Sequence, residues 1–445
     1  MESWIESLWT PLGGAIQMLH PEGTSQPQAD ASTATRPKRV AVRKETPSVP
    51  PRRFQFVPGP SDGEISPLQA SCGPSRASAT SKVVLKRARW LTSTEAVKQT
   101  IELTFELPES FQFRPGDSFG VYCPNRLDVV NEVLQRIGED EAIQSYTTED
   151  QAAFPSHLEV FPTTIRQLLL WVCDLASVPR KSFLAMLSLY CSDPADAERL
   201  LHLSSLKGKD EYRDVVEATR PTLADLFALF PSCKPPADHL VSCLPPMAPR
   251  YYSYASAPSP DRLARVAFSL ADIVTASGKV RSGLCTYWLA SLATEAGMIE
   301  ADKHFQPLVE LPGAFEGTSV ELQAFQQPSS KFHLPEDPAL LLAPRILIGP
   351  GTGVAPFMGF LAHLAHIPAD QRGDTWMFFG CRKIADDYLY QDELEAFVAD
   401  GLLHLETAFS RETEERVYVQ HKMLEHSKKL GDLIVDQNAF IYICG

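Results

Sequence analysis

Apolar and polar positions follow different patterns in different regions of this chain. From residue 81 they alternate, as in Val83 and Leu85 and again over 101–105, which is the period of half-buried strands. Between about 126 and 245 apolar residues recur every three or four positions, and strand-like runs return at 251–255 and 265–274. The pattern predicts an antiparallel β-barrel over 81–125 and 246–335, interrupted by a helical connecting insert over 126–245.

The last hundred or so residues follow a different pattern. Short runs that are apolar on both faces, at 345–348, 376–379, 403–409 and 440–443, alternate with helical segments. Such runs are typical of a parallel sheet covered on both sides. We therefore expect a multi-domain α+β and α/β protein whose barrel is followed, over 336–445, by a doubly wound parallel-sheet domain. Nucleotides bind at the carboxyl ends of such strands.

Residues 1–80 lack this patterning and are rich in Pro and Ser. The composition predicts a disordered linker, because it cannot bury enough apolar surface to order itself. Seven basic side chains between 36 and 53 either keep the linker solvated or dock on an acidic partner. Trp4 to Trp9 have helical spacing but Pro11 follows, so we expect a frayed terminus rather than an anchor helix.

Composition and charge narrow the class of protein. The 445 residues are 44% apolar and 22% charged, with 41 basic and 55 acidic side chains and a net charge of −14, which argues against nucleic acid as a partner. Nine cysteines without a CxxC pair suggest neither a disulfide framework nor a bound metal, and favour a reducing, cytoplasmic compartment. The most apolar stretch, 339–349, is too short to span a membrane. Glu2 and Glu6 argue against a presequence.

A glycine-rich turn follows the first buried strand of the C-terminal region. Gly349-Pro-Gly351-Thr352-Gly353-Val-Ala-Pro356 opens a helix, and Pro356 is tolerated because first-turn amides have no intrahelical partner. Free amides at a helix N-terminus suit a pyrophosphate, and glycines let the backbone approach it. The alternative is a plain tight turn.

A basic cluster follows a later strand of the same region. Ser410 and Arg411 are followed by Arg416, Tyr418 and Gln420. Two guanidiniums beside an aromatic ring suit a ribose phosphate next to an adenine, which would select NADPH over NADH. The alternative is a solvated helix start in which Glu412, Glu414 and Glu415 pair with the arginines. Cys444 ends the last strand. Its side chain either packs in the protein interior or lies against a ligand.

Two barrel segments suit a flavin. Arg250 can neutralise a diphosphate, Tyr252 can cover an isoalloxazine ring and Ser253 can hydrogen-bond the flavin edge. The amides of 283–286, which precede an apolar helix, can cap a second phosphate. Each signal is weak when taken alone.

Taken in order, these segments resemble a known family. The motifs are Pro-Arg-x-Tyr-Ser, Gly-x-Cys-Thr-x-Trp-Leu, Gly-Pro-Gly-Thr-Gly-x-Ala-Pro-Phe, Phe-Phe-Gly-Cys-Arg, Ser-Arg and Tyr-Val-Gln. They resemble the ferredoxin-NADP reductase module of diflavin reductases over about 81–445. Phe230-Pro-Ser-Cys-Lys-Pro-Pro236 and Cys285 are similar to the family members that reactivate cobalamin-dependent methionine synthase.

The resemblance implies an NADPH-dependent flavoprotein reductase that passes a hydride from NADPH to FAD, with Ser253 and Cys444 beside the reacting atoms and no metal. It implies that FAD is held by Arg250, Tyr251, Tyr252, Ser253, Ala267, Phe268, Ser269, Gly283, Leu284, Cys285 and Thr286. It implies that NADPH is held by Gly351, Thr352, Gly353, Ser410, Arg411, Arg416, Tyr418, Val419 and Gln420. Lys98 occupies a position where the family places a basic cofactor contact.

The resemblance also implies methionine synthase as partner, reached through an FMN domain. Residues 1–80 are too short and polar for that domain, so we expect no FMN in this chain. Family members continue beyond the position of Gly445 with an acidic residue that assists the hydride step and an aromatic that covers the flavin, so we expect weaker turnover here. The alternatives are a diflavin reductase serving haem monooxygenases or sulfite reduction, and a truncated nucleotide-binding protein without turnover.

Overall fold

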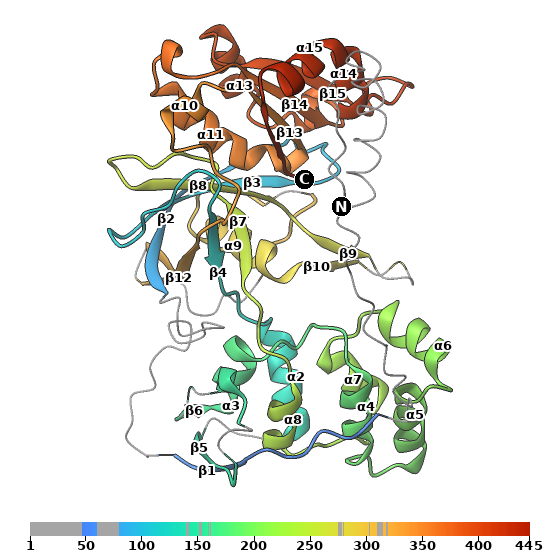
Figure 1. The fold of residues 1–445 in the computed structure, drawn as a ribbon. Coiled ribbons are helices and arrows are strands. Elements are labelled where there is room, and N and C mark those ends of the chain that lie inside the picture. Colours follow the sequence, from blue (N-terminus) through green and yellow to red (C-terminus); the bar gives the residue numbers. More distant parts are fainter. Residues whose placement is uncertain are drawn as a thin grey trace, which may run out of the picture.

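The computed structural model describes residues 47–59 and 80–445, except for 139–141, 151–153, 159, 161, 275–277, 279, 302, 309–314 and 317–318. The segment from Trp4 to Trp9 and most of the basic patch lie outside these residues. Within the described part, three regions are stacked in the order C-terminal domain, barrel and helical insert (Figure 1). The fold class predicted from the sequence is confirmed in each region.

The barrel is a seven-stranded antiparallel sheet with the order β7-β4-β12-β2-β3-β8, to which β11 adds beside β12. It closes where Tyr254 bridges Val266 and the Ala255 amide donates to the Arg265 carbonyl at 2.7 Å. Alternating side chains such as Leu103 and Phe105 fill its interior. The strands are β2 Ser81–Trp90, β3 Thr100–Glu106, β4 Ser118–Val121, β7 Arg250–Ser253, β8 Leu263–Ser269, β11 Phe315–Glu316 and β12 Ser319–Gln327.

A short hairpin and a helix complete this region. The hairpin pairs β9 Asp272–Val274 with β10 Val280–Ser282. The helix α9, Leu284–Glu295, follows directly and is apolar nearly all round, with Trp288 and Leu292 fully buried. A helix of this kind belongs in a core, and α9 packs in the same hydrophobic cluster as the barrel interior.

The insert between β4 and β7 is mainly helical, as the apolar spacing predicts. It also contains two short strands, β5 Ile143–Thr147 and β6 Thr163–Thr164, which the helical prediction did not include. Its helices are α2 Leu127–Ile137, η3 Ser156–Leu158, α3 Ile165–Gln167, η4 Leu168–Val172, α4 Lys181–Ser188, α5 Pro194–Ser204, α6 Lys209–Tyr212, η5 Arg213–Glu217, α7 Leu223–Leu229 and α8 Ala237–Cys243.

Residues 47–59 differ from the prediction of a disordered linker. They include β1, Gln55–Pro58, which pairs antiparallel with β5 of the insert. Phe54 is 2% exposed and packs edge-on to Tyr146, and the Arg52 guanidinium pairs with Asp238. The prediction was wrong here because it weighed the surrounding Pro and Ser and missed the short apolar run Phe54 to Val57.

The C-terminal domain is a four-stranded parallel sheet with the order β15-β14-β13-β16. Leu347 and Met377 face one apolar cluster, whereas Ile346 and Phe378 face another, so the sheet is covered on both sides. The strands are β13 Arg345–Pro350, β14 Thr375–Cys381, β15 His404–Phe409 and β16 Phe440–Ile443. The helices are α10 Pro338–Leu341, η6 Gly351–Val354, α11 Ala355–Ala365, η7 Ala369–Gln371, α12 Ile384–Asp387, α13 Gln391–Ala399, α14 Val419–Glu425, α15 Ser427–Gly431 and η8 Asp432–Asp436.

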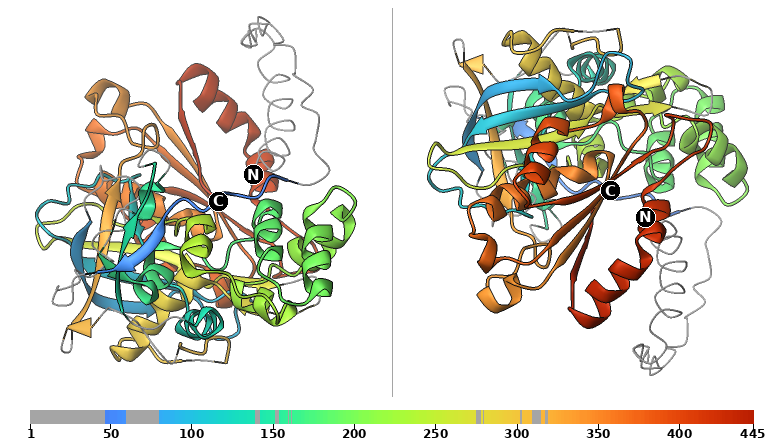
Figure 2. Two further views of the ribbon diagram at one scale, coloured as in Figure 1. Left: turned by 90° about the horizontal axis from the view of Figure 1, so that it is seen from below. Right: turned by 90° about the horizontal axis from the view of Figure 1, so that it is seen from above.

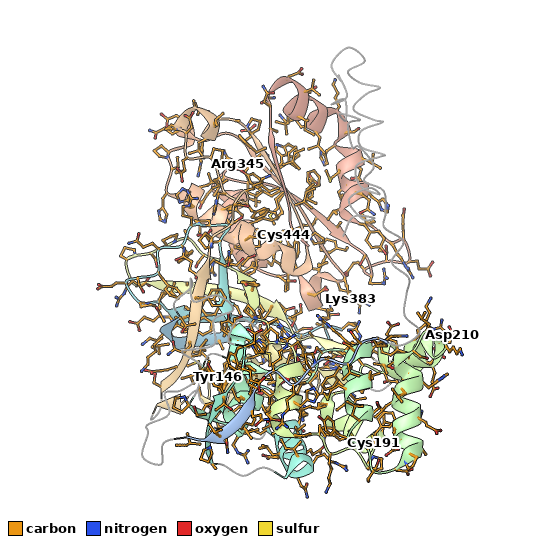
Figure 3. The ribbon with its side chains drawn as sticks, turned by 60° about the horizontal axis from the view of Figure 1, so that its bottom comes forward. Tyr146, Cys191, Asp210, Arg345, Lys383 and Cys444 are labelled. Carbon is orange, nitrogen blue, oxygen red and sulfur yellow. The ribbon has the colours of Figure 1, made fainter. Side chains whose placement is uncertain are left out.

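The carboxyl ends of these parallel strands point toward the barrel. Cys444 and Lys383 lie on the barrel-facing side of the domain, whereas Arg345, at the start of β13, lies farther away (Figure 3). Seen along the stack from either end, the C-terminus lies near the centre of the molecule (Figure 2). The turns after the strands are therefore placed between the two domains. Among the described residues, no helix has both the length and the apolar character needed to cross a bilayer.

Candidate functional site

The glycine turn after β13 requires its glycines. A Cβ on Gly353 would lie 2.2 Å from the carbonyl oxygen of Cys444, and one on Gly349 would lie 2.7 Å from the Gly353 carbonyl oxygen. Gly351 has φ +58°, in the left-handed region that favours glycine. No side chain caps η6 or α11 at its N-terminus, so the amide-rich end is available to an anion.

The arginines after β15 converge on one tyrosine. Hydrogen bonds from Arg411, and more weakly from Arg416, lower the pKa of the Tyr418 phenol. Among the described residues neither arginine forms an ion pair with a carboxylate, and Glu412 instead accepts the Ile384 amide at 3.0 Å. The alternative of a helix start neutralised by its own glutamates is thus not what the structure shows. Two uncompensated guanidiniums beside a phenol suit a phosphate.

Other predicted residues lie around this cluster. The Ser410 amide donates to the Cys381 carbonyl at 3.0 Å, which fixes the end of β15 against that of β14. The buried side-chain oxygen Oε1 of Gln420 has no hydrogen-bond partner in the described part of the chain, as expected for an acceptor kept for a ligand. Val419 is buried and packs against Ile348 and Phe378, so its side chain has a packing role.

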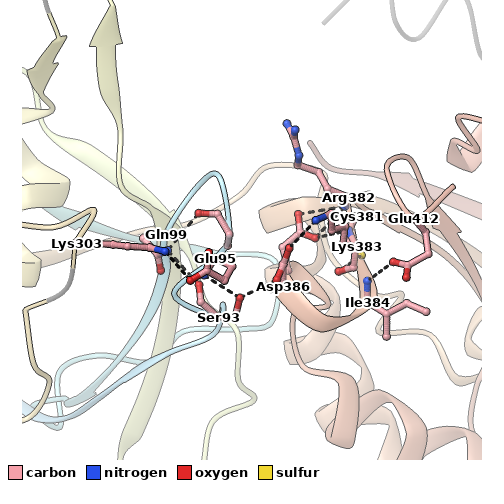
Figure 4. Close-up of polar contacts among 12 residues, drawn as sticks. Ser93, Glu95, Gln99, Lys303, Cys381, Arg382, Lys383, Ile384, Asp386 and Glu412 are labelled. Carbon is pink, nitrogen blue, oxygen red and sulfur yellow. Dashed lines mark hydrogen bonds and ion pairs between the residues drawn. The ribbon is translucent and has the colours of Figure 1, made fainter. Parts of the chain in front are cut away.

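Arg382 is a residue that the sequence analysis quoted within a motif but did not assign to the site. Its carbonyl oxygen accepts the Arg411 amide at 2.8 Å, and its guanidinium extends away from the neighbouring polar network (Figure 4). Its position directly after β14 could have indicated that it lies near Arg411, because neighbouring parallel strands end at the same edge of the sheet.

Lys98 lies exposed in the loop between β2 and β3. This loop is fixed to the C-terminal domain: the Ser93 amide donates to the Asp386 carbonyl at 2.8 Å, and the Ser93 hydroxyl donates to the Asp386 carboxylate at 3.0 Å (Figure 4). Asp386 is in α12, which follows Arg382 and Lys383. The barrel loop that carries Lys98 therefore contacts the element next to the arginine cluster.

A second candidate site is a cavity of about 610 Å³ between barrel and insert, a size typical of ligand pockets. Arg250, Arg281 and Leu284 line it, with residues of α2 and α7. Among the described residues, the Arg250 guanidinium contacts only backbone carbonyls, those of Ala248 and Pro249. A guanidinium without a carboxylate partner at a cavity wall suits a diphosphate.

The turn before α9 borders the same cavity. A Cβ on Gly283 would lie 2.6 Å from the Ala271 carbonyl oxygen, and no side chain caps the helix. The first-turn amides of this twelve-residue helix face the region where Leu284 and Ser282 line the cavity. This geometry fits the phosphate contacts predicted for 283–286.

Tyr252 and Ser253 lie on β7, which pairs with β4 so that Tyr252 is opposite Phe119 and Ser253 opposite Ser118. Burial raises the pKa of Tyr252, as does contact with the Cys285 thiol. Its ring packs against Phe268 with centroids 4.9 Å apart. Tyr251 faces the other way and is 50% exposed. Ala267 and Ser269 both lie on β8. Ala267 is buried, and the Ser269 hydroxyl hydrogen-bonds with the Thr100 hydroxyl.

Cys444 follows β16 and lies against Gly353. Burial raises the pKa of its thiol, which keeps the thiol protonated at neutral pH. Its amide donates to the Ile348 carbonyl at 3.0 Å, so the end of β16 is fixed beside the glycine turn. Thr352 lies within that turn.

Comparisons with known proteins match both domains. Residues 73–288 match the FAD binding domain model, and residues 347–445 match the oxidoreductase NAD-binding domain model. The chain is 35% identical over 390 residues to methionine synthase reductase of Mus musculus and 34% identical over 389 residues to that of Homo sapiens. Each alignment covers 82% of this chain and 54% of the relative.

A second group of relatives is similar to nearly the same extent. NADPH–cytochrome P450 reductase of Mus musculus is 34% identical over 360 residues, which cover 78% of this chain and 49% of the relative. The chain thus spans about half the length of the curated relatives it matches. The chain therefore contains an FAD-binding domain and an oxidoreductase NAD-binding domain, and across them it is similar to methionine synthase reductase and to NADPH–cytochrome P450 reductase.

Proposed function

We propose that this chain binds FAD and NADPH and passes a hydride from NADPH to the flavin. The observation that carries the proposal is the position of Arg411 and Arg416 just after β15, where neither guanidinium has a carboxylate partner among the described residues and that of Arg411 donates to the Ser410 carbonyl. A cationic cluster of this kind distinguishes NADPH from NADH, because only NADPH carries a 2′-phosphate. When bound, NADPH supplies the hydride and FAD accepts it.

The protein's own residues bind and orient the two nucleotides. We propose that Arg250 and the amides of 283–286 hold the FAD diphosphate, and that Tyr252 and Ser253 contact the flavin ring. On the facing domain we propose that the turn 351–353 holds the NADPH pyrophosphate, with Ser410, Tyr418 and Gln420 at the adenosine end. Cys444, next to this turn, would border the nicotinamide.

We further propose that the reducing equivalents serve the reductive reactivation of cobalamin-dependent methionine synthase, through an FMN domain. The similarity to methionine synthase reductase supports this. The free thiols of the eight described cysteines suit a reducing, cytoplasmic compartment. The nearly equal identity to NADPH–cytochrome P450 reductase makes a haem monooxygenase the competing acceptor.

The test begins with the purified chain. We expect the released flavin, identified by chromatography, to be one FAD per chain and no FMN. We also expect the flavin absorbance to fall when the protein is mixed with NADPH in a stopped-flow instrument. A protein that ignores added FAD, or whose flavin stays oxidised in NADPH, would contradict the hydride-transfer function.

The acceptor needs a second experiment. The chain, NADPH and inactive cob(II)alamin methionine synthase are mixed with and without a separately prepared FMN domain, and a haem monooxygenase replaces the synthase in a parallel series. We expect reactivation only with the FMN domain, and ferricyanide reduction without it. Reactivation without that domain would show that the proposed electron path is wrong.

A further inference from the structure

A partly buried cluster of charges joins the barrel to the NAD-binding domain. It consists of Arg89, Glu102 and Arg265 of the barrel and Tyr390 and Glu393 of the C-terminal domain, and we call it the Tyr390 clamp. The Tyr390 ring, 5% exposed, contacts two guanidiniums, whose central carbons in Arg89 and Arg265 lie 5.8 and 5.7 Å from the ring centroid. Tyr390 itself has φ +59°, a conformation that costs energy for a large side chain.

Two carboxylates complete the clamp. Glu393 accepts from Arg265 at 2.9 and 3.0 Å and from Arg89 at 2.7 Å. Glu102, whose side chain is 4% exposed, accepts from Arg89 at 2.8 Å. Two guanidiniums therefore balance two carboxylates. Removing one carboxylate would leave a cation uncompensated, which is costly at a partly buried position.

Arg265 also fixes the segment that follows β7, the strand whose Tyr252 and Ser253 are proposed to contact the flavin; we call β7 the flavin strand. Its guanidinium donates to the Ala255 carbonyl at 3.1 Å, and its amide donates to the Ser256 hydroxyl at 3.0 Å. These residues directly follow β7 and Ser253. The same side chain thus holds the flavin strand and, through Glu393, the NAD-binding domain.

The other domain touches the same segment closely. A Cβ on Gly359 of α11 would lie 3.0 Å from the Ser256 carbonyl oxygen and 3.1 Å from that of Tyr254. Helix α11 follows the glycine turn, and α13, which begins next to Tyr390, leads to β15 and the arginine cluster. A shift at the clamp would therefore move both nucleotide-binding turns relative to β7.

We infer that the Tyr390 clamp sets the position of the NAD-binding domain over the flavin strand, so that Glu393 and Arg265 act as positioning residues for hydride transfer. The inference rests on the proposed function, since it specifies how the two sites are aligned. Neither residue is among those proposed to contact the flavin or NADPH. Because a misplacement of about 1 Å can cost about a hundredfold in rate, the clamp acts on the transfer step rather than on nucleotide affinity.

The decisive variant is Glu393→Gln, which keeps the shape and removes one charge. Its matched control is Asp392→Asn, the exposed neighbour on the same helix. We expect Glu393→Gln to slow flavin reduction at saturating NADPH by about tenfold or more, while FAD content and the Kd for 2′,5′-ADP stay within about twofold. Asp392→Asn should match the wild type in all three measurements.

A readout that needs no cofactor separates this inference from the proposed function. Amide hydrogen exchange of the cofactor-free chain should rise in Glu393→Gln over 254–257 and 355–360, and stay unchanged in Asp392→Asn. If the wild type is not reduced by NADPH, the proposed function fails, whereas the exchange result still decides the role of the clamp.

The inference is overturned if exchange at 254–257 is unchanged, or if Glu393→Gln loses FAD and thermal stability but keeps the wild-type rate per bound flavin. If Glu393→Gln does not fold, Arg265→Lys replaces it, because lysine keeps the charge but cannot bridge Glu393 and Ala255 together. We then expect the same fall in kcat with KM unchanged. A wild-type rate in a folded Arg265→Lys would reject the clamp.

Discussion

The arginines of the two candidate sites differ in how they are neutralised. In the cavity between barrel and insert, Arg281 pairs with Asp225 at 2.6 Å and Arg126 with Asp128 at 2.8 Å. Among the described residues, Arg250 and Arg220 of the same cavity have no carboxylate partner, and the Arg250 guanidinium contacts carbonyl groups. In the NAD-binding domain, Arg411 and Arg416 have no carboxylate partner among the described residues. A paired arginine already has its anion, so it holds structure together, whereas an unpaired arginine is available to a ligand.

Arg250 should show the largest effect, because it is unpaired inside a cavity. Removing a charge-assisted contact to a phosphate costs about 1.5–3 kcal/mol, or roughly ten- to a hundredfold in affinity. We therefore expect Arg250→Ala to release FAD, measured by fluorescence titration of the cofactor-free protein. The control Arg126→Ala, in the same cavity but paired with Asp128, should change the FAD Kd by less than about threefold. Equal losses in both variants would contradict the distinction between paired and unpaired arginines.

Arg411 should come next, because its cluster is more open to solvent. Arg411→Ala is expected to weaken NADPH binding about tenfold and leave NADH nearly unchanged, since a single charge-assisted contact to the 2′-phosphate is lost. Titration with both nucleotides measures this. Lys422→Ala is the matched control, because Lys422 lies on the following helix and is paired with Glu425 at 2.8 Å. An equal loss for NADPH and NADH would assign Arg411 a structural role.

Arg281, which is paired, should affect stability rather than binding. Its guanidinium joins β10 to Asp225 at the start of α7 and donates to the Arg220 carbonyl. Arg281→Ala is expected to lower the free energy of unfolding by about 1–2 kcal/mol in urea titrations. Arg213→Ala, which breaks an exposed ion pair on η5, should leave the urea unfolding curve of the wild type unchanged. A wild-type unfolding curve for Arg281→Ala would show that this contact does not join barrel and insert.

The regular parts of the fold could be predicted from the sequence, because each has one dominant period. Alternation gave the barrel strands, and the two-sided apolar runs gave the parallel sheet with Ile346 and Leu347 on opposite faces. The strand β1 was missed because four residues are too few to show a period within a Pro-rich segment. What the period cannot predict is which residues from distant segments meet.

The candidate site illustrates that limit. Gly353 and Arg411 were predicted as site residues because local motifs surround them, and the structure places each just after a strand, where the sheet topology brings the turns together. The meeting of Arg265 and Glu393, 128 positions apart, has no local signature, since either residue alone is an ordinary charged side chain. Likewise, Arg382 needed the pairing of β14 with β15 to bring it next to Arg411.

Tyr418 should show the smallest effect, and it reports directly on whether the arginine cluster is free. Hydrogen bonds from Arg411 and Arg416 stabilise its phenolate and lower its pKa. A phosphate bound to the guanidiniums would compete with the phenolate, so 2′,5′-ADP should raise the pKa of Tyr418, as should Arg411→Ala. By linkage, NADPH binding should weaken as the pH rises through this pKa, and Tyr418→Phe should remove that part of the decline.

The measurement is tyrosinate absorbance during an alkaline titration, with the titration of Tyr418→Phe subtracted to isolate the Tyr418 phenol among the 12 tyrosines. If 2′,5′-ADP leaves the Tyr418 titration unchanged, the two arginines do not hold the phosphate, and the contrast between paired and unpaired arginines fails at the NADPH site.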